Sequence, residues 1–296
     1  MKYYFKKGFS FRNKKKIDIY SISEEKIPTF IGGKSLEVIT LDSIDDFVNI
    51  VNEDKNSKYF SFTNLSQEDL NSIIKGIKNR IVEFEYTDLR WGKKPLDLKV
   101  LKLCKKLKKV SIDYVEAPVV LWNMRFNHKL EEVKIINANR ISNQKGLLGA
   151  KLKKLTIRRH SHGTPDTKEL VIKDFSVFET MPNLEELTLL IKKKKDKSKD
   201  LVSLSKLNTI KKIELTKNYF YFNQYAWLSS KLPGVKGIGC YKVEYDHANE
   251  MDSYIINGSR MCWYIRGYEK AKLRRYISKF DKLVEMYKNK ENPPLK

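Results

Sequence analysis

One six-residue pattern recurs through most of the chain: apolar, two variable residues, apolar, one variable residue, apolar. Six of the seven intervals between its eight copies are 21 to 26 residues long, and the remaining interval, from Leu152 to Leu184, is 32 residues long. The positions are Leu36/Ile39/Leu41, Ser57/Phe60/Phe62 (with Ser in an apolar place), Ile81/Phe84/Tyr86, Leu107/Val110/Ile112, Leu130/Val133/Ile135, Leu152/Leu155/Ile157, Leu184/Leu187/Leu189 and Ile210/Ile213/Leu215. A fixed period of this length is typical of repeat proteins, whose units bury their apolar faces only against neighbouring units. The chain is therefore expected to fold as a stack.

The secondary structure of each unit follows from a change of period. The end of each hexamer alternates apolar and variable residues, which indicates a short strand with one buried face. Between hexamers, Ser66 and the Asp42-Ser43 pair each precede apolar residues at helical spacing, as helix caps do. Pro95 and Pro118 begin the next two intervening segments and predict first helical turns there. These patterns predict parallel strands connected by helices.

The clearest copies read LEEVKI at 130–135, LKKLTI at 152–157 and LEELTL at 184–189. They resemble the L-x-x-L-x-L core of the leucine-rich repeat family, over roughly residues 36–240. The resemblance implies an α/β horseshoe-shaped solenoid with its parallel sheet on the concave face and helices on the convex face. The family's Asn or Cys, three places after the last apolar residue, occurs only as Asn218, so other groups must satisfy the turns.

We expect three parts. Residues 1–31 form an N-terminal β cap, residues 32–240 form the leucine-rich repeat solenoid, and residues 241–296 form a C-terminal capping hairpin and helix. The Asn-Gly pair at 257–258 lies between two strand-like runs and predicts the hairpin. An apolar stripe with basic residues around it predicts a long helix at 273–287.

Three cysteines, Cys104, Cys240 and Cys262, stand at wide spacing, which indicates a reducing compartment rather than a disulfide scaffold. The first residues contain no apolar stretch with a cleavage site, which a signal peptide needs. No stretch approaches the ~18 uncharged apolar residues that would span a membrane. We therefore expect a cytoplasmic protein.

The formal net charge of +23 raises the question of nucleic-acid binding. The whole excess lies in four segments, and the rest of the chain is neutral. The segments are residues 2–16, 102–109, 192–199 and 266–290. Only 11 of the 59 basic residues are Arg, and Lys lacks the planar fork that suits bidentate recognition of phosphate or guanine. We interpret these segments as solvated surface.

The alternative is a polyanion binder, which would use the Lys-rich segments to contact nucleic acid or an anionic membrane. Its candidate residues are Lys192, Lys193, Lys194, Lys195, Arg274 and Arg275.

The residues between the buried positions of each strand would face outward on the concave surface, which the resemblance implies is a binding face. This surface mixes acids and bases, which favours a protein partner over a groove for phosphates. The candidate contact residues are Tyr59, Glu83, Glu85, Lys109, Asp113, Glu132, Lys134, Lys154, Arg158, Glu186, Lys212 and Glu214.

The sequence contains no complete motif for phosphate binding, metal binding or catalysis. The Gly-Lys-Ser sequence at 33–35 lacks the first glycine of a phosphate-binding loop, because Pro28 stands in its place. His160 and His162 have no third metal ligand nearby. We expect no catalytic residue, metal or cofactor, and leave an active site assembled in space as the third alternative.

The densest aromatic cluster lies at 219–227, where a connecting helix is expected, and we predict that it packs in the core. Base stacking, or an anchor for a protein partner if part of it is exposed, is the alternative.

Overall fold

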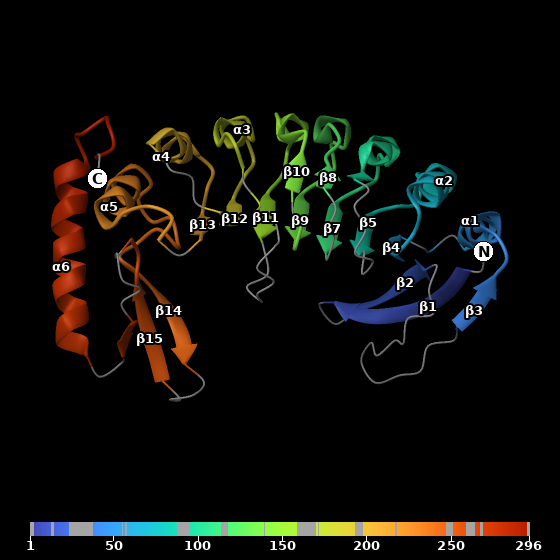
Figure 1. The fold of residues 1–296 in the computed structure, drawn as a ribbon, viewed down its shortest axis with the longest axis horizontal. Helices are drawn as coiled ribbons and strands as arrows, with labels where there is room; N and C mark the ends of the chain where they lie inside the picture. The colour runs from blue at the N-terminus through green and yellow to red at the C-terminus, as the bar shows by residue number, and fades with distance from the viewer. Residues whose placement is uncertain are drawn as a thin grey trace. The chain divides into compact units, whose positions relative to one another are not determined.

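The computed structural model of the chain is a mixed α/β structure. It describes residues 3–12, 15–23, 38–54, 56, 58–87, 95–113, 118–138, 140–158, 170, 172–192, 198–216, 218–246, 251–258, 264–266 and 269–294. The chain divides into two compact units: unit 1 comprises residues 1–152 with 158–170, and unit 2 comprises residues 153–157 with 171–296. In each unit, helical connections lie on one side of short parallel strands (Figure 1). This arrangement is consistent with an α/β solenoid.

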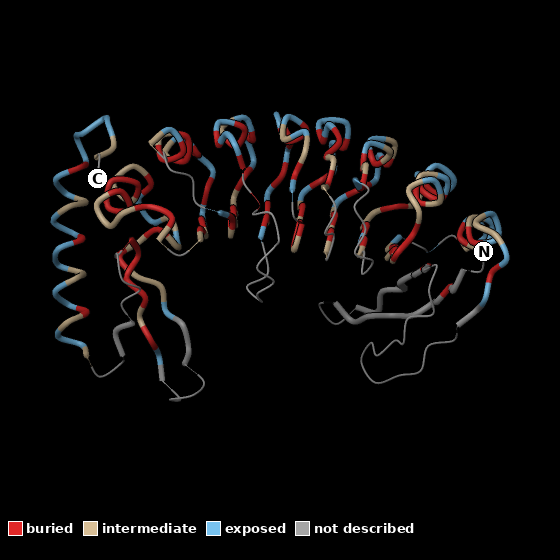
Figure 2. Tube along the Cα trace, viewed as in Figure 1, coloured by how far each residue is buried: buried red, intermediate tan, exposed pale blue. Residues whose placement is uncertain are grey.

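Four strands of unit 1 arise from consecutive hexamers: β4 (Tyr59–Thr63), β5 (Glu83–Thr87), β7 (Lys109–Asp113) and β9 (Glu132–Ile136). Each runs parallel to the next, with no slip in register from one strand to another. The second and third apolar positions of each hexamer are buried, while the other residues of these strands are exposed or half-buried, except Ile136 at the end of β9, which is buried (Figure 2). The hexamer pattern therefore marks these strands correctly.

In the N-terminal segment, where a β cap is expected, β1 (Tyr3–Arg12) and β2 (Lys15–Ser23) form an antiparallel hairpin, and β2 continues the sheet parallel to β4. The first hexamer departs from expectation. It contributes β3 (Val38–Leu41), which pairs antiparallel with β1 and is not the first parallel strand. The hexamer reports that one face of a strand is buried, as Leu41 is, but it does not encode the direction of the strand or its neighbour.

The first two connections of unit 1 are the expected helices, α1 (Ile44–Glu53) and α2 (Gln67–Ile77). The Ser43 hydroxyl accepts a hydrogen bond from the amide three residues later, and the Asp46 carboxylate accepts one from the Ser43 amide, which completes a capping box. Ser66 caps α2 in the same way through its hydroxyl. Both predicted helix starts are confirmed.

The next three connections of unit 1 are not α-helices. They are short strands of a second parallel sheet, each followed by a 3₁₀ turn: β6 (Leu96–Asp97) with η1 (Lys99–Leu103), β8 (Pro118–Val120) with η2 (Met124–Phe126), and β10 (Arg140–Ser142) with η3 (Gln144–Leu147). The helical starts predicted at Pro95 and Pro118 are therefore wrong. Pro118 is the first residue of a strand, a place that suits proline because no ladder donor is lost there.

Asparagines satisfy several turns of unit 1 from places that differ from the family's usual one. Asn64 and Asn137 lie two places after the last apolar residue of their hexamers, with φ angles of 53° and 60°. Asparagine tolerates this left-handed conformation better than most residues. The backbone N–H groups of Asn64 and Asn137 donate to the carbonyls of Thr87 (3.1 Å) and Arg158 (2.9 Å), respectively. These bonds connect the turn after one strand to the end of the next strand.

Unit 2 contains β11 (Lys154–Arg158, of which residues 154–157 belong to this unit), β12 (Glu186–Leu190) and β13 (Lys212–Leu215), with α3 (Ser176–Glu179), α4 (Ser198–Ser205) and α5 (Phe222–Lys231). Beyond β13, Lys236 forms a single parallel bridge with Lys212. The aromatic cluster packs inside this unit as predicted: Tyr219, Phe220, Tyr225 and Trp227 are each 1% exposed or less.

The C-terminal part of unit 2 is an antiparallel sheet of β14 (Tyr241–Asp246), β15 (Met251–Ile256) and β16 (Tyr264–Arg266), followed by α6 (Lys270–Tyr287). The β15 and β16 strands pair with Ile255 opposite Tyr264, so their connection is longer than the two-residue Asn-Gly turn that the sequence predicts, and β14 is an additional strand. Helix α6 packs on α5 through Phe280 and Phe222, whose ring centroids are 5.4 Å apart. Among the described residues, no helix is long and apolar enough to cross a bilayer.

Candidate binding site on the strand face of unit 1

The side of the parallel strands that faces away from the helical connections, here called the strand face, carries the variable residues of the hexamers. Because the strands of unit 1 are in register, these residues form two rows across the sheet. The first row is Tyr59, Glu83, Lys109 and Glu132, and the second row is Ser61, Glu85, Ser111 and Lys134.

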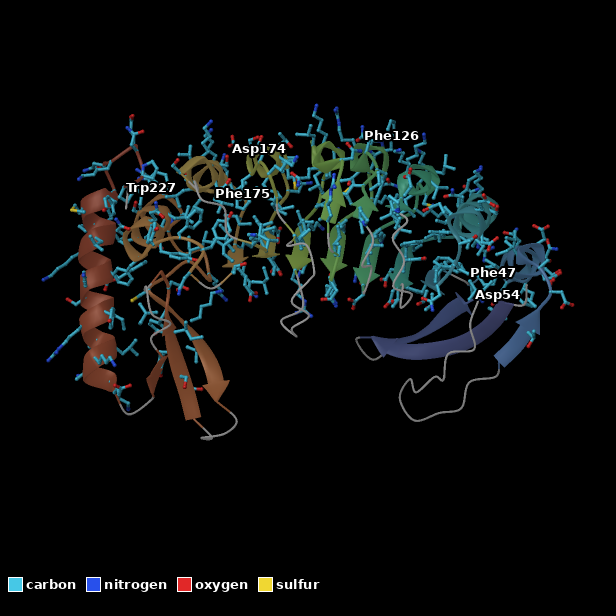
Figure 3. All side chains as sticks on the ribbon, in the orientation of Figure 1. Phe47, Asp54, Phe126, Asp174, Phe175 and Trp227 are labelled. Atoms are coloured by element: carbon cyan, nitrogen blue, oxygen red, sulfur yellow. The ribbon has the colours of Figure 1, made fainter. Side chains whose placement is uncertain are left out.

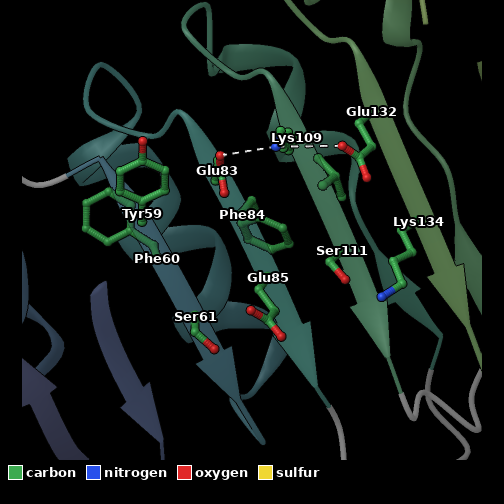
Figure 4. A pocket seen from close by; sticks show the side chains of 11 residues that line it. Tyr59, Phe60, Ser61, Glu83, Phe84, Glu85, Lys109, Ser111, Glu132 and Lys134 are labelled. Atoms are coloured by element: carbon green, nitrogen blue, oxygen red, sulfur yellow. Dashed lines mark ion pairs between the residues drawn. The ribbon is translucent and has the colours of Figure 1, made fainter. Parts of the chain in front are cut away.

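A hollow of about 430 Å³ lies over these rows, and Figure 4 shows its lining. All eight residues of the two rows line it, together with Phe60, Phe84 and Val110, which are almost fully buried between them. The hollow thus spans β4, β5, β7 and β9. It contains six of the twelve residues expected to form the concave binding surface, and Asp113 lies on β7 just beyond them.

The first row is a chain of alternating charges, with one lysine between two carboxylates. The Lys109 Nζ atom lies 3.7 Å from a carboxylate oxygen of Glu83 and 3.7 Å from one of Glu132 (Figure 4). The side chains of Lys109, Glu83 and Glu132 are partly exposed, at 45%, 19% and 38%, so each pair contributes at most ~1 kcal/mol to stability. Lys109 offsets part of the negative charge, and this edge of the hollow remains acidic.

The second row is different. Within the part of the chain that the structure describes, the side chains of Glu85 and Lys134 make no ion pair or hydrogen bond. The serines Ser61 and Ser111 occupy the other places of the row, and their short side chains leave the space that the hollow occupies. Two opposite charges therefore remain available to a ligand.

The remaining candidates of unit 1 do not line the hollow. The Asp113 carboxylate accepts a hydrogen bond from the Asn137 side-chain amide at 3.1 Å, which gives it a role in the turn after β9. Arg158 is exposed, and its carbonyl accepts the Asn137 amide.

The candidates of unit 2 pair with one another. Lys154 lies 2.6 Å from Glu186, and Lys212 lies 3.7 Å from Glu214. All four side chains are between 36% and 49% exposed, so these are surface ion pairs of small energy.

The polyanion candidates are described only in part. Lys192 is exposed, whereas Lys193, Lys194 and Lys195 lie outside the described residues. Arg274 and Arg275 are exposed on α6 and line a shallow hollow of about 580 Å³ with Ser278, Lys279, Lys282, Leu283 and Met286.

The described residues hold no group of three or more His, Cys, Asp and Glu side chains that could bind a metal. Burial raises the pKa of the Cys104 thiol to about 12 and that of Cys240 to about 12, so both are protonated at neutral pH and suit packing better than nucleophilic chemistry. His160 and His162 lie outside the described residues.

Ser61 and Ser111 were not singled out from the sequence. They stand in outward places of their hexamers, and the signal that could have identified them is a small side chain between charged residues of neighbouring hexamers. Comparison with protein-family models, with curated proteins and with solved structures finds no match to this chain.

Proposed function

We propose that the chain is a non-enzymatic, leucine-rich repeat type module that binds a protein partner through the concave strand face of its parallel sheet. The observation that carries this proposal is the hollow on the strand face, where Glu85 and Lys134 have no ion-pair or hydrogen-bond partner among the described residues. Sites on regular strands are held more precisely than sites on loops, which suits recognition of a defined surface.

The charge of the hollow supports a protein partner. Its lining includes three carboxylates, from Glu83, Glu85 and Glu132, and two ammonium groups, from Lys109 and Lys134. A nucleic-acid groove needs an excess of positive charge along the phosphate backbone, whereas protein interfaces match patches of both signs. The cytoplasm is the proposed location, with the unpaired thiols of Cys104 and Cys240 as support.

Site-specific photo-crosslinking in cells that express the protein tests this function. A benzophenone amino acid in place of Tyr59, an aromatic residue that lines the hollow, should crosslink one defined protein, identified by mass spectrometry. The same probe at Lys102, an exposed residue of η1 on the opposite side of unit 1, is the matched control and should not capture that protein. Equal capture at both positions, or none at Tyr59, contradicts the proposal.

The α6 surface favours a second candidate, polyanion binding. Four exposed cations, Arg274, Arg275, Lys279 and Lys282, line the same hollow as Met286, which is 47% exposed. Cations beside an apolar side chain suit an anionic membrane surface, and cations alone suit nucleic acid.

Vesicle co-sedimentation and oligonucleotide anisotropy test this second candidate. The variant Arg275→Glu/Lys282→Glu should lose binding, and Lys102→Glu/Lys106→Glu on the surface of unit 1, with the same change in net charge, should keep it. Equal binding by both variants contradicts a site on α6.

A further inference from the structure

The second row of the hollow carries one charge of each sign at a fixed separation. Glu85 on β5 and Lys134 on β9 are two strands apart, with Ser111 of β7 between them. Neighbouring strands lie about 4.8 Å apart, so the two backbone positions are about 9.6 Å apart across the sheet. A ligand that satisfies both charges must present complementary charges at a similar spacing.

The hollow is narrow in the other direction. Successive outward residues of a parallel strand are about 6.6 Å apart, so the longer side chains of the first row lie close to the second row on one side. Tyr59, Glu83, Lys109 and Glu132 form that side, and Thr63, Thr87 and Asp113 occupy the next row on the other. An α-helix with its side chains is about 10–12 Å wide, whereas an extended backbone fits above a single row in which two of the four residues are serines.

An extended conformation also matches the spacing of the charges. A polyproline II segment has three residues per turn and a rise of about 3.1 Å, so residues three apart project on the same side and are about 9.3 Å apart. This distance agrees closely with the two-strand separation of Glu85 and Lys134.

We infer that the hollow binds an extended protein segment, crossing the strands along the second row, in which a basic residue and an acidic residue three positions apart contact Glu85 and Lys134. The inference rests on the proposed function and specifies the chemistry of the partner. The small residues Ser61 and Ser111 leave room for the backbone of the segment, and their hydroxyls can hydrogen-bond to its peptide groups.

Selection from a phage-displayed library of random 12-residue peptides tests the inference. The library is first depleted on a Ser111→Trp variant, in which an indole fills the hollow, so that peptides for other surfaces are removed. It is then selected on the wild-type chain. A parallel selection uses the double variant Glu85→Lys/Lys134→Glu, which has the same net charge as the wild type. For this selection the library is first depleted on the triple variant that also carries Ser111→Trp. Circular dichroism and thermal melting confirm that all variants are folded.

The wild-type selection should enrich peptides with a basic and an acidic residue three positions apart. The double variant should enrich the same spacing in reverse order. Synthetic peptides from the wild-type pool should lose about tenfold in affinity for Glu85→Gln or Lys134→Gln, because each change removes one charge pair. The variant Lys102→Gln should bind them as the wild type does.

The failures of the two proposals are distinguishable. If no peptide is enriched on the wild-type chain after depletion, the inference is overturned, and the proposed function fails with it only if the crosslinking probe in the hollow also captures no protein. If peptides survive but show no charge pair, or are the same for the wild type and the double variant, only the inference is overturned. A charge pair seven positions apart, which corresponds to two helical turns, overturns the extended conformation.

Discussion

The indole N–H of Trp122 donates a hydrogen bond of 2.7 Å to the side-chain oxygen of Asn127, and both residues are buried. The Asn127 amide nitrogen donates in turn to the carbonyls of Leu101 (2.9 Å) and Cys104 (2.8 Å), in the preceding connection (Figure 3 shows the side chains of this region). One amide thus joins two consecutive repeats on the helical side of unit 1, where it adds a second hydrogen bond to carbonyls that already accept the backbone amides of Cys104 and Leu107.

Replacing Asn127 should therefore destabilise the protein. Asn127→Ala leaves the Trp122 donor and two buried carbonyls without these partners, and we expect a loss of about 2–4 kcal/mol in the free energy of unfolding. Urea denaturation followed by circular dichroism measures it. His128→Ala, at the exposed neighbouring position, should change stability by less than ~0.5 kcal/mol. Equal effects of the two changes would show that the network contributes nothing.

Two glycines of unit 2 allow the energetic cost of a left-handed backbone to be distinguished from the cost of a steric clash. Gly234 and Gly237 both have positive φ angles, 80° and 90°. A Cβ atom at Gly237 would lie 2.1 Å from the Ile213 carbonyl oxygen, whereas one at Gly234 would meet nothing within 4 Å. Gly234→Ala should cost about 1–2 kcal/mol from the left-handed conformation alone. Gly237→Ala should destabilise the protein more than Gly234→Ala, because it adds the clash with the Ile213 carbonyl. Thermal melting should therefore give a lower midpoint for Gly237→Ala. A lower midpoint for Gly234→Ala would contradict the predicted clash.

The buried thiols should resist alkylation in the folded protein. Cys104 and Cys240 are 0% and 8% exposed, and their raised pKa values leave almost no thiolate at neutral pH. Incubation with iodoacetamide at pH 7.5 should leave both residues unmodified, as read by peptide mass spectrometry, while 8 M urea should allow complete modification. Rapid labelling of either cysteine without denaturant would show that its surroundings open.

The same thiols predict a loss of stability at high pH. Burial raises the pKa of Cys104 from its ordinary value of 9.0 to about 12, so the folded state retains a proton that the unfolded state releases. This contribution is complete below pH 9 and is lost as the pH rises towards 12. Burial also raises the pKa values of Tyr219 and Tyr225, which extends the loss above pH 10.

Unfolding free energies at pH 8 and pH 10.5 measure this effect. The decrease between the two should be smaller in Cys104→Ala than in the wild type. An identical decrease in both proteins would assign the pH dependence to other groups.

Much of the fold follows from local sequence. The alternation in Lys109–Asp113 or Glu132–Ile136 decides which face of the strand is buried, and Ser43 and Ser66 mark helix starts through hydrogen bonds within four residues. Such interactions depend on neighbours in the chain, so their pattern is legible in a single sequence.

Other features depend on tertiary pairing. The direction of β3 is set by its pairing with β1, and Pro118 begins a strand because it pairs with β6 and β10. The hollow depends on a register that brings Ser61, Glu85, Ser111 and Lys134 into one row, although each is 23 to 26 residues from the next. The sequence indicates which of these residues face outward, but their alignment depends on how each connection packs.

The N-terminal hairpin limits where further repeats can be added to the parallel sheet. The β2 strand occupies the side of β4 on which another parallel unit would be added, and the sheet ends in β3, a strand of four residues with the opposite direction. Short edge strands discourage pairing with other molecules. New repeats would therefore enter by duplication inside the array, and this end would not serve as a template for joining one copy of the protein to another.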